Sequence, residues 1–267
     1  MSIQFVTAKG CNFAYRWEGL SSGPVLMLAH AMGTSHRIWD KQIDALKGDF
    51  RILRYDWRGH GDSDSPTGPY SLSQFSDDAV GVMDALELER VHWVGISTGG
   101  MIGQGLGIHH GHRLRSLTLC NTTSESSPWY RSWVAERQAV VRESGMQPVW
   151  EMTKKLWFND AFVDAAGIDY EAIKKVFVAT SVTGYLGGTS AVTDLNYTQD
   201  LHRITVPTLV IAAGDDPVTP LANSQTIHTS IAGSELQIVA HQRHFSNVEA
   251  PQEFNQILVS FLKRQRD

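Results

Sequence analysis

Apolar and polar residues form two kinds of strand pattern along this chain of 267 residues, alternating segments and apolar runs, and each pattern predicts a type of strand. Residues 3–7 and 12–18 alternate apolar with polar side chains around Lys9-Gly10, which predicts an antiparallel strand pair at a sheet edge. Largely apolar runs predict strands covered on both faces. Such runs occupy residues 24–29, 91–96, 114–119 and 206–213, and residues 51–56 fit a neighbour of the first.

Helical patterns fill the segments between these runs, and the order of elements predicts the topology. A short strand is expected over residues 236–239. Helices are expected over 38–46, 71–86, 101–110, 221–230 and 251–264, with Ser71 as the N-cap of the second. Because strands alternate with helices, the pattern predicts an α/β protein with a parallel sheet.

One segment breaks this alternation. Between residues 121 and 200 no strand pattern is visible, and tryptophans at positions 129, 133, 150 and 157 lie among helical stretches. We therefore predict a helical cap formed by residues 121–200, inserted into an α/β core formed by 1–120 and 201–267. The tryptophans are either the core of this insertion or the wall of an apolar pocket, and we expect one or two of them to face a ligand.

Composition and charge narrow the range of partners. The net charge of -5 and pI near 6.1 supply no basic field for nucleic acid or an anionic membrane, which leaves a small molecule as the expected partner. Cys11 and Cys120 lie in separate apolar segments, which favours two reduced thiols. Residues 1–10 lack a basic start followed by an apolar core, so we expect a cytoplasmic protein. The oligomeric state is not predicted by the sequence.

The chemistry centres on Gly95-Ile96-Ser97-Thr98-Gly99, which follows a predicted strand and precedes a predicted helix. This context favours Ser97 as a nucleophile at a sharp strand-to-helix elbow, with an ordinary tight turn as the alternative. The two glycines have a steric reason, because a Cβ at either position would clash in so tight a turn.

A serine nucleophile needs a histidine to take its proton and an acid to orient that histidine. Both partners are expected in loops at the carboxyl ends of later strands. Asp215 and Asp216 follow the strand that ends at residue 213, and His241 and His244 follow the strand that ends near 239. The residue pattern alone leaves both pairs open.

Four segments resemble the α/β-hydrolase superfamily and, within it, the 3-oxoadipate enol-lactonase group. They cover residues 53–61, 99–104, 119–122 and 207–212. The resemblance extends over nearly the whole chain, and it implies an α/β-hydrolase fold: a mostly parallel twisted sheet flanked by helices, with a helical cap insertion.

The resemblance also assigns site residues. In the family the acid precedes an apolar residue and Thr-Pro, which here selects Asp216. The family's histidine is followed, after one residue, by Ser-Asn-x-Glu-x-Pro, which here selects His244. The oxyanion-hole donors of the superfamily correspond to the backbone amides of Met32 and Thr98.

The sequence departs from the family at Arg243, at Thr98 and at His30-Ala31. The first two lie beside the chemistry, where they bear on substrate choice. Gly59-His60-Gly61 resembles a structural turn of the family, so we expect a structural role for His60 and for His36.

Several other histidine, arginine and tryptophan residues are candidates for binding a metal or a substrate. We interpret His109, His110 and His112 as a solvated helix end and expect no metal, because thiols and a clear carboxylate set are missing nearby. Arg37 and Arg131 are candidates for holding a substrate carboxylate, with surface solvation as the alternative. Trp129 and Arg131 are the cap residues that we select as substrate-binding candidates.

Together these residues predict hydrolysis of a lactone or carboxylic ester through an acyl-enzyme, without a cofactor. The resemblance implies an activity like that of 3-oxoadipate enol-lactonase. Three alternatives stay open: a general carboxylesterase, a cofactor-free dioxygenase on the same fold with the His-Asp pair as base, and a non-catalytic binding module.

Overall fold

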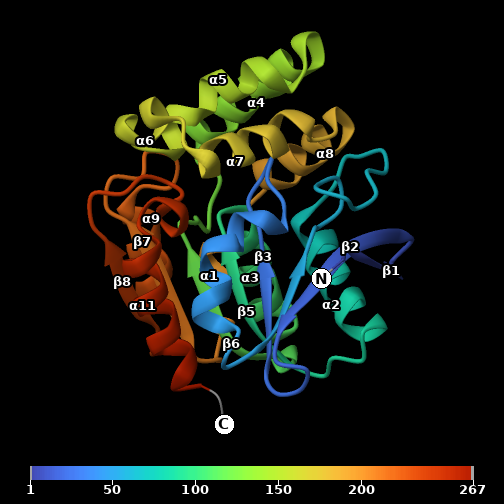
Figure 1. The fold of residues 1–267 in the computed structure, drawn as a ribbon, viewed down its shortest axis with the longest axis vertical. Coiled ribbons are helices and arrows are strands. Elements are labelled where there is room, and N and C mark those ends of the chain that lie inside the picture. Colours follow the sequence, from blue (N-terminus) through green and yellow to red (C-terminus); the bar gives the residue numbers. More distant parts are fainter. Residues whose placement is uncertain (1, 266–267) are drawn as a thin grey trace.

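A central sheet organises residues 2–265, the part of the chain that the computed structural model describes. Its eight strands lie in the order β1-β2-β4-β3-β5-β6-β7-β8 (Figure 1). Their bounds are β1 Gln4–Ala8, β2 Cys11–Gly19, β3 Val25–Ala29, β4 Arg51–Tyr55, β5 Val91–Ile96, β6 Leu114–Cys120, β7 Thr208–Ala213 and β8 Glu235–Val239. Strand β2 pairs antiparallel with β1 and with β4, and the other neighbours are parallel.

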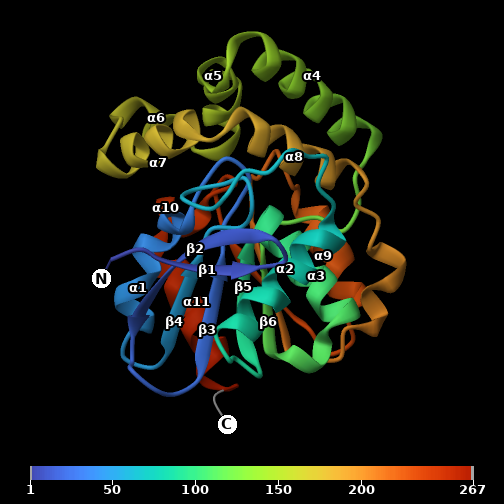
Figure 2. The same ribbon diagram turned by 90° about the vertical axis from the view of Figure 1, so that its right-hand side faces the viewer.

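Helices cover both faces of this sheet. Figure 2 shows α1 (Asp40–Leu46) and α11 (Pro251–Lys263) on one side and α2 (Leu72–Ala85), α3 (Thr98–His109) and α9 (Leu221–Ser230) on the other. Every residue of β3, β5 and β7 is buried, because helices lie above and below these strands. The predicted α/β-hydrolase architecture, with a mostly parallel sheet between helices, is confirmed.

One predicted helix begins where the sequence pattern placed it, and another begins two residues later because of how its start is capped. Ser71 caps α2 as expected, and its Oγ accepts a hydrogen bond from Gln74 N at 3.1 Å. The helix expected over 38–46 instead begins at Asp40, because Ser35 starts the 3₁₀ turn η1 (His36–Trp39) before it. The remaining short helices are η2 Gly111–Arg113, η3 Thr198–Arg203 and α10 Ser246–Glu249.

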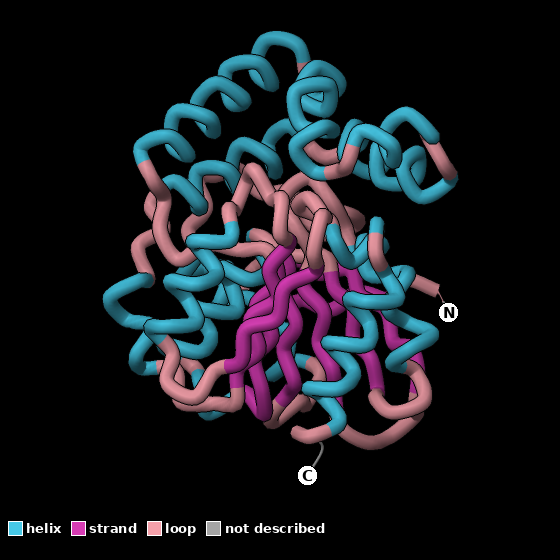
Figure 3. The backbone as a smooth tube through the Cα atoms, turned by 90° about the vertical axis from the view of Figure 1, so that its left-hand side faces the viewer, coloured by secondary structure: helices cyan, strands magenta, loops and turns pink. Residues whose placement is uncertain are grey.

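Five helices between β6 and β7 lie beyond one end of the sheet, at the top of Figures 1 and 3. We call them the cap helices: α4 Pro128–Ser144, α5 Met146–Trp157, α6 Asp160–Ala165, α7 Ile168–Ala179 and α8 Val182–Thr193. The chain leaves and returns side by side, since Glu125 and Asn196 form an antiparallel bridge. The division at residues 121 and 200 into a core and a cap stays a prediction.

The two cysteines are free thiols inside the fold, as predicted. Cys11 lies in β2 and Cys120 ends β6, and burial raises the pKa of both thiols. Both are therefore uncharged near neutral pH. Within residues 2–265, none of the helices has the length and apolar character needed to span a bilayer.

Candidate active site

Ser97 occupies the turn between β5 and α3 in a backbone conformation that few non-glycine residues adopt, with φ 54° and ψ -115°. Two hydrogen bonds hold it there: Ser97 N donates to Cys120 O at 2.9 Å, and Thr122 Oγ1 donates to Ser97 O at 2.8 Å. A Cβ on Gly95 would lie 2.1 Å from Gly99 O, and one on Gly99 would lie 2.3 Å from Ala29 O. The steric reason expected for both glycines is confirmed.

His244 and Asp216 are in direct contact inside the protein. His244 Nδ1 lies 2.7 Å from Asp216 Oδ2, and both side chains are buried. The carboxylate is fixed on its other side, because Oδ1 accepts from Val218 N at 2.8 Å and from Thr219 N at 3.1 Å, and Oδ2 accepts from Thr219 Oγ1 at 2.6 Å. An acid held in this way keeps the histidine in one orientation, with Nδ1 toward the carboxylate.

The competing residues lie at the surface. The side chains of Asp215 and His241 are 61% and 91% exposed, and they face each other across 3.8 Å. Neither lines the cavity that contains Ser97. The structure therefore separates a buried pair, Asp216 with His244, from an exposed pair, Asp215 with His241. The residue pattern alone did not distinguish these two pairs.

Ser97 and His244 line the same small cavity under the cap helices. The cap supplies most of its other walls, including Tyr130, Trp133 and Trp157. Within residues 2–265, the Ser97 hydroxyl and the His244 ring share no direct hydrogen bond. Such contacts are commonly long in enzymes without substrate and shorten when the substrate binds.

Of the two predicted oxyanion donors, Thr98 follows Ser97 directly in the chain, and Met32 lines the cavity that also contains Ser97. Thr98 is the first residue of α3, so its amide has no acceptor within the helix. Met32 lines the cavity from a turn in which Thr34 N donates to Ala31 O at 3.2 Å. Among residues 2–265 neither amide has an acceptor, and the N-terminus of α3 adds a favourable dipole for an anion.

His30 supports the turn that contains Met32. Its Nδ1 donates to Ala31 O at 2.8 Å, its Nε2 accepts from Trp57 N at 3.3 Å, and its ring stacks on the Trp57 indole. Complete burial lowers the pKa of His30 to about 4, so the ring is neutral at pH 7. His60 is also buried against Trp57, and it does not line the cavity that contains Ser97.

Two residues after β6 position the site, and the sequence analysis assigned them no role. Asn121 Nδ2 donates to His244 O at 2.7 Å and to Ser246 Oγ at 2.9 Å, and Thr122 holds the Ser97 carbonyl as described above. Asn121 has φ 42°, which asparagine tolerates better than most residues. The only sequence signal was their place in a segment that resembles the family.

Arg243 points away from the cavity. Its Nη1 donates to Lys155 O at 2.5 Å and to Phe158 O at 3.0 Å, and it lies 3.2 Å from Asp160 Oδ1. These groups belong to the end of α5 and the start of α6. Arg243 therefore joins the loop that contains His244 to the cap helices.

The cap tryptophans divide by position. Trp133 and Trp157 line the cavity that contains Ser97, whereas Trp150 is packed inside the cap. Trp129 is 54% exposed and lines a neighbouring groove. Arg131 lines neither space, and its guanidinium donates to Ser126 O, so these contacts give no support for a substrate contact by Arg131.

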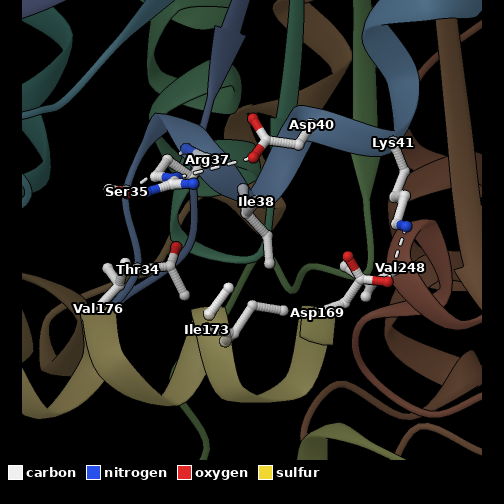
Figure 4. Close-up of a pocket in the computed structure, with 11 residues that line it drawn as sticks. Thr34, Ser35, Arg37, Ile38, Asp40, Lys41, Asp169, Ile173, Val176 and Val248 are labelled. Carbon is white, nitrogen blue, oxygen red and sulfur yellow. Dashed lines mark hydrogen bonds and ion pairs between the residues drawn. The ribbon is translucent and has the colours of Figure 1, made fainter. Parts of the chain in front are cut away.

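A separate pocket, shown in Figure 4, lies where α1 meets α7. Ile38 and Ile173 extend into it from opposite sides, and the ion pair between Lys41 and Asp169 crosses its edge at 2.7 Å. Arg37 lines it and pairs with Asp40. It shares no lining residue with the cavity that contains Ser97, so the two spaces are separate.

Two further histidines, His36 and His110, make contacts with carboxylates. His36 Nδ1 lies 3.1 Å from the buried Asp56 carboxylate, and His110 Nε2 lies 3.1 Å from Asp77 Oδ1. Within the described range of residues 2–265, no group of three or more His, Cys, Asp or Glu side chains has an arrangement that suits a metal ion.

Known proteins share this fold over nearly the whole chain. Residues 25–257 match the model of the alpha/beta hydrolase family. The 3-oxoadipate enol-lactonase 2 of Acinetobacter baylyi is 32% identical over 97% of this chain and 96% of its own. A solved hydrolase from Pseudomonas aeruginosa has a TM-score of 0.93 at 38% identity, covering 97% of this chain and 98% of that one.

The crystal structure of the enol-lactonase from Burkholderia xenovorans has a TM-score of 0.94 at 30% identity, and covers 97% of this chain and 100% of that one. The family model and these relatives each span the elbow, the loop after β7 and the loop after β8. Given matches of this length, the chain belongs to the α/β-hydrolase family.

Proposed function

We propose that this protein is a serine hydrolase that opens a lactone or cleaves a carboxylic ester through an acyl-enzyme. The observation that carries the proposal is the 2.7 Å contact between His244 and Asp216, at the wall of the cavity that also contains Ser97. A buried histidine held by a buried carboxylate beside a strained serine suits the activation of a hydroxyl nucleophile.

In the first half of the reaction, Ser97 Oγ attacks the substrate carbonyl as His244 Nε2 takes its proton. Asp216 stabilises the imidazolium through Nδ1. The tetrahedral oxyanion lies against the amides of Met32 and Thr98. When the intermediate collapses, the bond to the leaving oxygen breaks, and His244 returns the proton to that oxygen.

In the second half, water replaces the alcohol. His244 takes a proton from the water, whose oxygen attacks the acyl carbonyl, and the collapse of the second intermediate releases the acid and restores Ser97. In a lactone the leaving oxygen stays attached to the acyl chain, so one turnover opens the ring. If the lactone is an enol ester, the released enol becomes a ketone.

The lactone assignment is supported by relatives that are named enol-lactonases. A general carboxylesterase would use the same residues in the same roles. Comparing the kcat/KM values of lactones with those of aryl and alkyl esters therefore decides between the two. A cytoplasmic location remains a prediction from the sequence.

The test of the mechanism is intact-protein mass after exposure to a fluorophosphonate. Wild type should gain one adduct, and Ser97→Ala and His244→Ala should gain none. Asp215→Asn is the matched control, because Asp215 lies outside the cavity, and it should label at the wild-type rate.

An unlabelled wild type, or equal labelling of Ser97→Ala, would overturn the proposal. Oxygen uptake with a hydroxyquinolone would then identify a cofactor-free dioxygenase. Tight binding of a small molecule without turnover would instead identify a binding module.

A further inference from the structure

The catalytic cavity is too small to hold a whole ester. Its volume is about 20 Å³, which is room for about one water molecule. Aromatic cap residues close it, among them Tyr130, Trp133 and Tyr185. Most of a bound substrate must therefore lie beyond this cavity, or these side chains must move.

A larger groove adjoins the cavity. We call it the Trp129 groove; it has a volume of about 460 Å³, within the range of small-molecule sites. It lies between the start of α4 and the loop that follows Asp216, and it shares two lining residues, Tyr130 and Val218, with the catalytic cavity. The two spaces are thus neighbours across one pair of side chains, next to the proposed acid.

The residues that line the groove are of two kinds. Trp129, Pro217 and Val218 are apolar. Others, such as Thr198 and Asn223, carry neutral polar groups. An exposed tryptophan next to prolines provides a flat surface for the hydrocarbon part of a ligand, and hydroxyl and amide groups bind neutral oxygens.

The groove lacks a cation. Glu125 is the one Asp, Glu, Lys or Arg among the residues that line the groove or the cavity. The nearby arginines are engaged elsewhere: Arg131 donates to Ser126 O, and buried Arg137 donates to Met152 O under the ring of Trp133. A carboxylate in the groove would meet a like charge and no guanidinium.

We propose that the Trp129 groove binds the uncharged, partly apolar arm of the ester or lactone whose carbonyl is attacked by Ser97, and that it disfavours an arm that ends in a carboxylate. This inference rests on the proposed hydrolase function and names its substrate class. Trp129 is the specificity-determining residue for the apolar part of the arm, and Glu125 is the residue that repels an anionic end.

The test compares three esters that differ in one arm: p-nitrophenyl acetate, p-nitrophenyl octanoate and the mono-p-nitrophenyl ester of suberic acid. In wild type the octanoate should have the highest kcat/KM and the suberate a lower one. Trp129→Ala should lower the octanoate-to-acetate ratio about tenfold, the effect of losing roughly 55 Å² of apolar contact. Phe5→Ala, which removes an exposed aromatic side chain from β1, is the matched control and should leave the ratio unchanged.

Glu125→Gln should raise the suberate-to-octanoate ratio about threefold at low ionic strength, the effect of two like charges roughly 6 Å apart in water. The same comparison with alkyl acetates identifies the arm that enters the groove. A ratio that depends on Trp129 in either series supports the proposal and assigns the groove to the acyl or to the alcohol side.

Ratios that are unchanged by Trp129→Ala in both series would overturn it. Within the series that depends on Trp129, an arm that ends in a carboxylate and is cleaved as fast as the neutral arm of the same length would also overturn it. Failure of the hydrolase proposal is distinguishable, because fluorophosphonate labelling and acetate cleavage would then also be missing.

Discussion

Replacing Asn121 by alanine tests how much this residue stabilises the loop that contains His244. The substitution removes the hydrogen bonds from Asn121 Nδ2 to His244 O at 2.7 Å and to Ser246 Oγ at 2.9 Å, all in the buried interior. It also places alanine at φ 42°, where a Cβ is strained and where asparagine is better tolerated.

The expected loss of stability follows from these contacts. Each hydrogen bond contributes about 1 kcal/mol, and leaving the His244 carbonyl without a partner costs roughly 1 kcal/mol more. The left-handed backbone adds about 1 kcal/mol for alanine. Asn121→Ala should therefore lower the free energy of unfolding by about 4 kcal/mol. Asn121→Gly, which has no Cβ and no strain, should lower it by about 3 kcal/mol.

Activity should fall as well, because the loop that carries His244 loses its anchor. A displacement of about 1 Å at a catalytic group costs roughly 100-fold in rate, so kcat should fall by about 10- to 100-fold while KM changes little. Urea unfolding and p-nitrophenyl acetate kinetics on wild type, Asn121→Ala and Asn121→Gly measure both effects. A stability loss below about 0.5 kcal/mol in the glycine variant, or an unchanged kcat in both, would refute the reasoning.

Four further predictions concern pH, the cap and the elbow. Burial lowers the pKa of His30 to about 4, so between pH 6.5 and 4 this histidine is protonated in the unfolded chain and neutral in the folded protein. The free energy of unfolding, measured in urea, should therefore fall as the pH is lowered from 6.5 to 4. Burial raises the pKa of Glu249 to about 7, so Glu249→Gln should be more stable than wild type at pH 8, and this advantage should shrink toward pH 5; a constant difference would contradict it. Lys41→Met removes a half-exposed ion pair to Asp169 and should lower the Tm by less than about 4 °C, measured by calorimetry; a larger loss would mean that the pair does more than a surface pair does. Gly95→Ala places a Cβ 2.1 Å from a backbone oxygen and should abolish fluorophosphonate labelling; normal labelling would show that the elbow relaxes easily.

The order of elements was predictable because it follows from local patterns. Buried strands read as apolar runs, and Ser71 caps its helix through a residue only three positions away. The pattern of residues could not choose between Asp215 and Asp216, which differ by one position. The choice came from the family resemblance, and its physical basis is local: Thr219 and two backbone amides hold Asp216, whereas Asp215 is left at the surface.

The role of Asn121 was not predictable in this way. Its hydrogen-bond partner His244 lies 123 residues later in the chain, and an asparagine after a strand is an ordinary turn residue. Nothing in the local sequence indicates that this side chain points toward another loop. The same limit applies to the cap tryptophans, since periodicity predicts helices and leaves open which helix face meets the core.

The contacts of Arg243 were also not predictable from the local sequence, and they change its expected effect on substrate choice. Its position next to His244 suggested an effect on the substrate, yet its guanidinium binds carbonyl oxygens at the end of α5. The backbone next to His244 also binds the end of α5, because Phe245 N donates to Trp157 O at 3.1 Å. Trp157 lines the cavity that contains Ser97. Arg243 therefore acts on the cavity through the position of α5, and a change at this residue should alter the fit of bulky substrates through the cap, without any direct contact between its charge and the substrate.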